Sequence, residues 1–157
     1  MNETIMLEHR DLEDIVSQVW TSLMAQETAN AAPWESVASD VVAAGVAISG
    51  CWNGWVVVET SQQGALDLAS TLFDLPRDEI APSDLADALG EVANIVGGSV
   101  KSTLTGTAEL SLPSVEHGPS TIAGLSEASL QVHAAWQSHP LRISVLDDNS
   151  KSTKEQS

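Results

Sequence analysis

The sequence predicts an α+β domain: a mainly antiparallel sheet with two central helices packed on it and an additional N-terminal helix. Apolar residues recur at helical spacing in three stretches, and strand patterns occur in a central hairpin and in three later runs. These helices and strands come in groups rather than in strict alternation, which favours an antiparallel sheet. A chain of 157 residues suits one core. We therefore assign residues 1–147 to a single domain and residues 148–157 to a polar tail that we expect to be disordered.

The first helix is expected over Leu12–Leu23. Acidic residues lie early in this stretch, where negative charge stabilises a helix N-terminus. An Ala- and Asn-rich connector, residues 25–33, follows it, and we expect Trp34 to be an anchor in the core or in an interface. The helical spacing is that of Leu12, Ile15, Val16, Val19, Trp20 and Leu23.

A β-hairpin is expected over residues 41–60, where valine-rich runs flank Asn53-Gly54. This pair is typical of a two-residue type I′ turn, because both of its positions require positive φ. Trp52 and Trp55 flank the predicted turn. We favour a cross-strand pair of these tryptophans that stabilises the hairpin over an exposed aromatic patch.

Two central helices follow the hairpin. Ser61 is the candidate N-cap of the first, which closes at Leu75-Pro76. The second opens after Pro82-Ser83 and can extend to Val100. Strand patterns return afterwards, over Glu109–Leu112, Leu130–Trp136 and Leu141–Leu146.

The composition argues against several kinds of partner. Six Lys+Arg against 22 Asp+Glu give a net charge of −16, so we expect no nucleic acid and no membrane surface as partner. No window approaches the ~20 apolar residues that cross a bilayer, and the N-terminus lacks the layout of a secretory signal. The single cysteine, Cys51, fits a reducing compartment. We expect a cytoplasmic protein.

The second central helix has two distinct faces. One face is polar and carries Asp87, Glu91 and Asn94, with Gly98 and Lys101 further along. Side chains three or four residues apart are neighbours on a helix, so the first three form one cluster. The opposite face is an apolar stripe of Leu85, Leu89, Val92 and Val96, which we expect to pack on the sheet.

Glycines accompany this polar face at Gly90, Gly97 and Gly98. Each costs about 1 kcal/mol relative to alanine inside a helix, and a missing side chain allows another backbone to approach closely. From spacing alone, two interpretations stay open. The commoner one is a solvated helix face with Gly97-Gly98 ending the helix; the other is a docking surface.

The motif Asp87-x-x-x-Glu91-x-x-Asn94 resembles the signature of the CheC/CheX/FliY chemotaxis phosphatases. In that family an Asp or Ser, a Glu and an Asn stand at this spacing and a proline follows downstream. Pro113 takes the place of the proline, at a shorter interval after Asn94 than is typical of the family. The resemblance extends over about residues 41–146. Because the motif occurs once, the chain resembles the single-motif CheX type.

This resemblance implies a phosphatase that acts on the aspartyl phosphate of a response-regulator receiver domain of the CheY type. Glu91 would pair with the active-site lysine of the regulator, and Asn94 would orient the attacking water. Asp87, Gly98 and Pro113 match motif positions with supporting roles. Phosphoryl transfer depends mainly on positioning and charge stabilisation, so the residues needed are few.

The resemblance also has implications for cofactors and assembly. The receiver domain would bring the Mg²⁺, and this chain would bind no cofactor or metal of its own. Its four histidines match no metal-ligand spacing. CheX-like proteins are homodimers, which implies dimerisation through sheet edges or the N-terminal helix.

Two other hypotheses stay open. The chain can be a non-catalytic CheX-like module that binds a receiver domain or another signalling partner without dephosphorylating it. It can also be a structural subunit whose Trp52–Trp55 hairpin mediates assembly.

Overall fold

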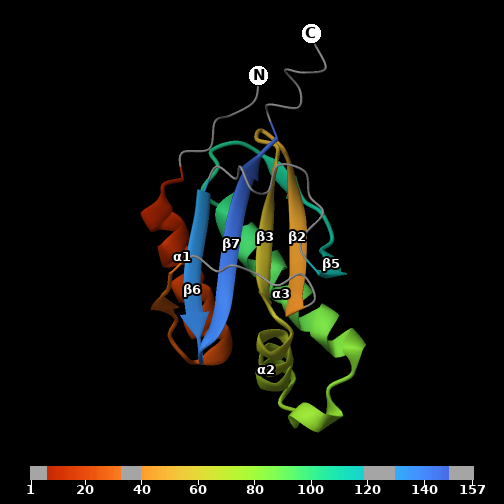
Figure 1. The fold of residues 1–157 in the computed structure, drawn as a ribbon. Coiled ribbons are helices and arrows are strands. Elements are labelled where there is room, and N and C mark those ends of the chain that lie inside the picture. Colours follow the sequence, from red (N-terminus) through yellow and green to blue (C-terminus); the bar gives the residue numbers. More distant parts are fainter. Residues whose placement is uncertain (1–6, 33–39, 119–129, 149–157) are drawn as a thin grey trace.

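The computed structural model describes residues 7–32, 40–118 and 130–148 (Figure 1). Trp34 and the predicted tail from residue 149 onwards lie outside the described residues. The elements in chain order are α1 (His9–Met24), β1 (Ala29–Asn30), β2 (Val41–Gly50), β3 (Gly54–Ser61), α2 (Gln62–Phe73), the short 3₁₀ helix η2 (Arg77–Glu79), α3 (Pro82–Lys101), β4 (Ala108–Leu110), β5 (Ser114–His117), β6 (Leu130–Trp136) and β7 (His139–Asp147).

The described strands form one seven-stranded antiparallel sheet, which confirms the predicted α+β class. Its order is β1-β6-β7-β3-β2-β4, and β5 also pairs with β2. β4 and β5 therefore lie one after the other along the same edge of β2. The sequence patterns did not predict β1 or β5, because stretches of two and four residues are too short for alternation to be recognised.

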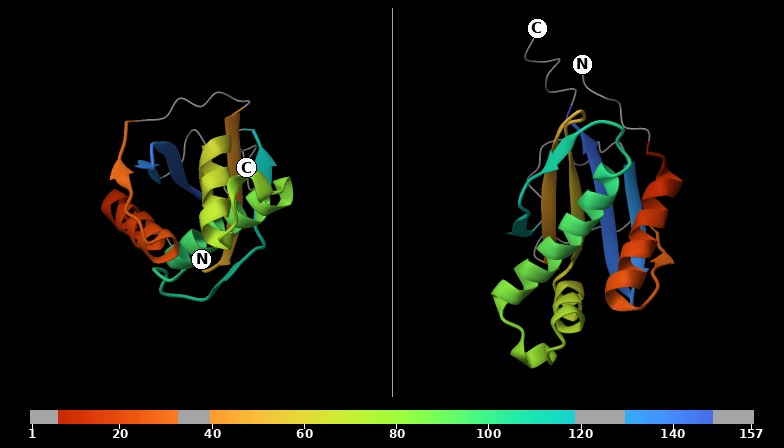
Figure 2. Two further views of the ribbon diagram at one scale, coloured as in Figure 1. Left: turned by 90° about the horizontal axis from the view of Figure 1, so that it is seen from below. Right: turned by 180° about the vertical axis from the view of Figure 1, so that it is seen from behind.

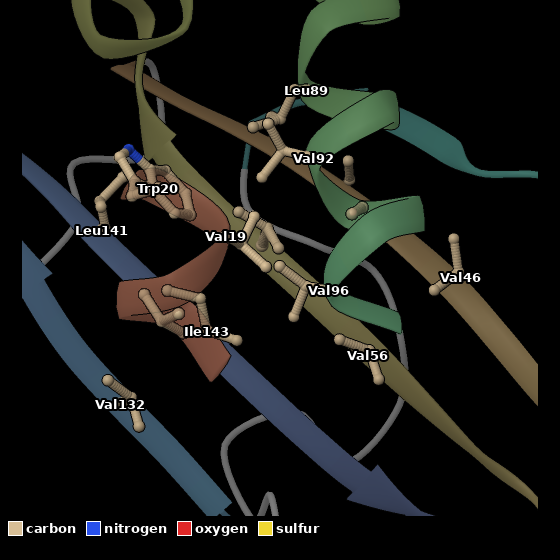
Figure 3. Close-up of a cluster of buried hydrophobic side chains, with 14 of the residues drawn as sticks. Val19, Trp20, Val46, Val56, Leu89, Val92, Val96, Val132, Leu141 and Ile143 are labelled. Atoms are coloured by element: carbon tan, nitrogen blue, oxygen red, sulfur yellow. The ribbon is translucent and has the colours of Figure 1, made fainter. Parts of the chain in front are cut away.

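The helices α1 and α3 lie across one face of the sheet, and α2 lies beyond the ends of the central strands (Figure 2). Between the helices and the sheet lies the hydrophobic core (Figure 3). Its labelled side chains come from both helices and from four strands: Val19, Trp20, Leu89, Val92, Val96, Val46, Val56, Val132, Leu141 and Ile143. This packing places the other side of α3 towards solvent.

The ends of the central helices follow the predicted signals. Ser61 caps α2, and its hydroxyl accepts a hydrogen bond of 3.0 Å from the Gly64 N–H. α3 begins with Pro82 in its first turn, and the Asp84 carboxylate accepts the Ala81 N–H at 2.9 Å. α3 continues to Lys101, so the glycine pair within it does not end the helix.

The hairpin of β2 and β3 is present, but its predicted type I′ turn is wrong. Ile48 pairs with Gly54, so the connection is a longer loop, and neither Asn53 nor Gly54 has positive φ. The reason is that β2 runs on past β3 to pair with β4, down to Gly50 opposite Ala108. The chain therefore cannot reverse at the Asn-Gly pair.

Trp52 does not form a cross-strand pair with Trp55 and is not part of an exposed patch. Trp52 lies in the loop and is fully buried in the core, whereas Trp55 is a partly exposed residue of β3 opposite Ala47. The buried Trp52 ring leaves no room for a side chain at position 54, so a glycine is needed there. A Cβ at Gly54 would lie 2.2 Å from the Trp52 ring and 2.4 Å from the Leu146 carbonyl oxygen.

A two-residue turn occurs instead between β6 and β7. Trp136 pairs with His139, and Gln137 and Ser138 between them both have positive φ, as in a type I′ turn. The Trp136 indole N–H and the Gln137 side-chain amide each donate to the Gln26 side-chain oxygen at 2.7 Å. These bonds fix the turn against the segment that follows α1.

The sheet face away from the helices contains a buried ion pair. The Arg142 guanidinium donates two hydrogen bonds to the Glu59 carboxylate, at 2.7 and 2.9 Å. Glu59 is fully buried on β3, and its cross-strand neighbour Arg142 on β7 is itself paired with His133 of β6. The pair compensates the cost of placing the carboxylate out of water.

Candidate functional site

The polar face of α3 is set by the burial of its other side. The apolar stripe that the sequence predicts is buried, with Leu89, Val92 and Val96 fully so. At 3.6 residues per turn, this fixes Asp87, Glu91 and Asn94 on the face turned away from the sheet. Asp87 and Glu91 are exposed, and Asn94 is partly exposed.

An open groove of about 550 Å³ runs along this face of α3. Its lining comes from two parts of the chain, α3 and the segment that joins β4 to β5. The lining residues are Ala86, Asp87, Gly90, Glu91 and Asn94 on the first side and Leu112, Pro113 and Val115 on the second. The structure therefore brings four of the five predicted site residues, Asp87, Glu91, Asn94 and Pro113, to one groove.

Within the described part of the chain, no residue engages the functional groups of the three polar side chains of the groove. Neither Asp87, Glu91 nor Asn94 forms a side-chain hydrogen bond or an ion pair with another residue in the described part of the chain. A carboxylate accepts hydrogen bonds and binds cations, while a carboxamide both donates and accepts. The groove can thus bind a cationic group and orient a water at the same time.

A β-bulge brings Pro113 to the groove. Leu110 pairs with Ile48, and Ser114 pairs with Gly45, so three residues on this strand face two on β2. The ladder is fixed at the start of the bulge by Ser111. Its N–H donates to the Ala47 carbonyl, and its hydroxyl accepts the Ala47 N–H, both at 2.9 Å.

The glycines of α3 have different environments. A Cβ at Gly90 would lie 3.3 Å from the Pro113 ring, and a Cβ at Gly97 would lie 2.5 Å from a methyl group of Val46. The glycines predict that another backbone approaches α3 closely. In the structure, side chains of β2 and of the β4–β5 segment approach it instead. A Cβ at Gly98 would have no described residue within 4 Å beyond its own helix and chain neighbours. Gly98 does not line the groove, and neither does Lys101 in the last turn.

Two kinds of feature are absent from the described residues, a cluster of metal ligands and a membrane-spanning helix. They contain no group of three or more His, Cys, Asp or Glu side chains that could hold a metal ion. Within the same residues, no helix combines the length and the apolar character needed to span a membrane.

Residues 42–133 match the sequence model of the family described as "Chemotaxis phosphatase CheX". This stretch is more than half of the chain and includes all of the groove. The chain belongs to the CheX family. The match confirms the resemblance that the motif on α3 indicates. No curated protein matches the sequence significantly.

Solved structures of CheX proteins share the fold of this family member. The chemotaxis protein CheX from Vibrio vulnificus is 17% identical, with a TM-score of 0.70 over 92% of this chain and 99% of that one. The CheX–CheY–BeF3–Mg+2 complex from Borrelia burgdorferi is 18% identical, with a TM-score of 0.67 over 89% and 99%. CheX from Desulfovibrio desulfuricans is 21% identical, with a TM-score of 0.66 over 87% and 95%. At these identities the likeness concerns the fold.

On the second side of the groove, the sequence predicted Pro113 but not Leu112 or Val115. The alternation in residues 109–112 predicts a continuous strand, but the bulge turns Leu112 outward and leaves it 88% exposed. Val115 follows on β5, which was not predicted. The signal that could have indicated the bulge is Pro113, because a proline lacks the N–H that a continuous ladder requires.

Proposed function

We propose that this protein is a phosphatase that hydrolyses the aspartyl phosphate of a response-regulator receiver domain of the CheY type. The observation that carries the proposal is the groove on α3. There the motif residues Asp87, Glu91 and Asn94 line one open surface, with side chains that no other described residue engages. Membership of the CheX family supports the same reaction.

The partner in this proposal is a phosphorylated receiver domain. A solved CheX relative forms a complex with CheY, BeF3 and Mg+2. We propose that the receiver supplies its own Mg²⁺ and lysine, and that this chain adds no metal or cofactor. We propose that the two proteins bind each other in the cytoplasm. We also propose that this chain forms a homodimer. Light scattering would test this by measuring the molar mass in solution.

Glu91 has the position and the charge for docking. It is exposed on the groove, one helical turn before Asn94. Its carboxylate would pair with the lysine ammonium of the receiver, and this contact would set the register of the two proteins. Asp87, one turn earlier, adds negative charge to the same surface.

Asn94 would orient the attacking water. Its carboxamide oxygen accepts a hydrogen bond from the water, whose oxygen then attacks phosphorus in line with the bond to the aspartate oxygen. That bond breaks, and the receiver carboxylate and inorganic phosphate are released. The chain needs no nucleophile of its own, because the oxygen comes from water.

The other motif residues would act through the shape of the site. Pro113 packs against Gly90 and closes one side of the groove. Gly98 leaves the helix surface bare beyond Asn94, since no other described residue lies within 4 Å of where its Cβ would be, apart from its own helix and chain neighbours. The missing side chain of Gly98 would allow the receiver surface to approach α3 closely.

The test is the decay of a phosphorylated receiver domain with the wild-type protein and with the Asn94→Ala and Glu91→Ala variants. Loss of an orienting group should slow hydrolysis by about a hundredfold, while Asn94→Ala should still bind the receiver. Gln18→Ala is the matched control, because Gln18 is an exposed carboxamide on α1. It should keep the wild-type rate.

The outcomes separate the hypotheses. Full activity of Asn94→Ala would exclude the water-orienting role. A wild-type protein that binds the receiver and leaves its decay unchanged would be the non-catalytic module instead. The hypothesis that the Trp52–Trp55 hairpin mediates assembly is weakened, because Trp52 is fully buried and cannot contact another subunit.

A further inference from the structure

One apolar side chain of the groove, that of Leu112, is almost fully exposed. Leu112 is 88% exposed, far more than the two other large exposed hydrophobic residues of the described chain, Phe73 at 40% and Leu75 at 37%. It is also the one of the three that lines the groove. A leucine in this position contributes almost nothing to the core, since burial is what makes it stabilising.

The structure holds Leu112 in this exposed position from both sides. Ser111 before it makes two hydrogen bonds to Ala47 of β2, and its hydroxyl lies 3.0 Å from the Leu112 carbonyl oxygen. Pro113 after it packs on Gly90 of α3. The bulge therefore presents the side chain from a fixed backbone, so little backbone entropy is lost when a partner covers it.

The position of Leu112 relative to the polar residues indicates what would cover it. Glu91 and Asn94 line one side of the groove and Leu112 the other, and all three are open to the same solvent space. A folded protein that brings a lysine and an acyl phosphate to the polar side must pass its neighbouring surface over the leucine. Specific interfaces combine buried apolar side chains with hydrogen-bonded polar groups around them.

We infer that Leu112 is the apolar anchor that binds the receiver domain to the groove and sets the affinity for it. This inference rests on the proposed function and adds a residue outside the motif. The partner it selects is a folded receiver domain with an apolar patch beside its phosphorylation site and lysine. Leu112 acts on binding and does not touch the reacting atoms.

The expected effect follows from the size of the side chain. Burying a leucine is worth about 1.5–3 kcal/mol, which corresponds to roughly a tenfold to a hundredfold change in affinity. Replacing Leu112 by glutamine should therefore raise the Kd for the receiver at least about tenfold. The KM for the phosphorylated receiver should rise in parallel, and kcat should stay within about twofold.

The experiment compares the wild type with Leu112→Gln and with the matched control Leu75→Gln. Leu75 follows α2 and does not line the groove. Calorimetry measures the binding of each protein to a receiver domain loaded with beryllofluoride and Mg²⁺. Phosphate release gives kcat and KM on the phosphorylated receiver. Thermal unfolding of Leu112→Gln should match the wild type, because so little of this side chain is buried.

Weaker binding by Leu112→Gln with wild-type affinity of Leu75→Gln supports the inference, even if the wild type proves to have no phosphatase activity. Wild-type affinity of Leu112→Gln overturns it and leaves the proposed function intact. An equal loss in both variants also overturns it, because the effect would then not belong to the groove. A wild-type protein that neither binds nor dephosphorylates any receiver domain encoded in its own genome overturns both the inference and the proposed function.

Discussion

Two neighbouring glycines of α3 allow a test of how closely this helix packs on the sheet. Gly97→Ala and Gly98→Ala make the same chemical change at adjacent positions of the same helix. Alanine is favoured over glycine inside a helix by about 1 kcal/mol, and this gain is shared by both variants. The two variants differ in what the added methyl group meets.

At Gly98 the added Cβ would meet no atom of another described element within 4 Å. The helix gain should therefore appear almost in full, and Gly98→Ala should be more stable than the wild type by about 0.5–1 kcal/mol. At Gly97 the Cβ would lie 2.5 Å from a methyl group of Val46 and 3.2 Å from one of Leu110. Val46 is fully buried and stiff at χ1, so it cannot turn away.

Overpacking of this kind costs about 1–3 kcal/mol. After subtraction of the helix gain, Gly97→Ala should be between neutral and about 2 kcal/mol less stable than the wild type. The difference between Gly97→Ala and Gly98→Ala cancels the helix gain and equals the packing strain, about 1–3 kcal/mol. Urea unfolding measures both variants under the same conditions, and a difference of 1 kcal/mol corresponds to about 2–4 °C in Tm for a chain of this size. Equal unfolding midpoints of the two variants would refute the close contact of α3 with β2.

Two further predictions concern the sheet face away from the helices. Glu59→Gln removes the negative charge that accepts two hydrogen bonds from the mostly buried Arg142 guanidinium, and it should lower the free energy of unfolding by about 3–5 kcal/mol; a urea midpoint close to that of the wild type would contradict this. Burial, with a contribution from Arg142, lowers the pKa of His133 below its ordinary value of 6.5. The unfolded chain therefore takes up this proton first as the pH falls below about 6.5, and the folded state loses stability. His133→Gln should lose less stability between about pH 7.5 and pH 5.5 than the wild type does, and an unchanged pH dependence of urea unfolding would exclude this role of His133.

The polar side of the groove could be predicted because it depends on local geometry alone. Asp87, Glu91 and Asn94 lie on one helix, and the apolar stripe of that helix determines which way they face. The same reasoning predicted the Ser61 cap and the start of α3 at Pro82. In each case the relevant partners are within a few residues in the sequence.

The hairpin turns and the exposure of Leu112 depend on pairings between distant parts of the chain, and the sequence patterns did not predict them. Asn53-Gly54 predicts a tight turn, yet the pairing of β2 with β4 lengthens the loop there, and Gln137-Ser138 makes the two-residue turn without the usual residues. The exposure of Leu112 depends on the register of β4 and β5 against β2. Such register is set by tertiary contacts that no local pattern contains.

The order of the strands also has a consequence for how the chain folds. β7 comes last among the described elements but lies at the middle of the sheet, between β6 and β3. Its contacts with β3 join residues more than 80 positions apart, such as Glu59 and Arg142. Until β7 is in place, β3 has an unpaired edge and the two parts of the sheet are not connected. We therefore expect folding on the slow scale of milliseconds to seconds that is typical of sheets with distant pairings, and completion only after Asp147 has left the ribosome.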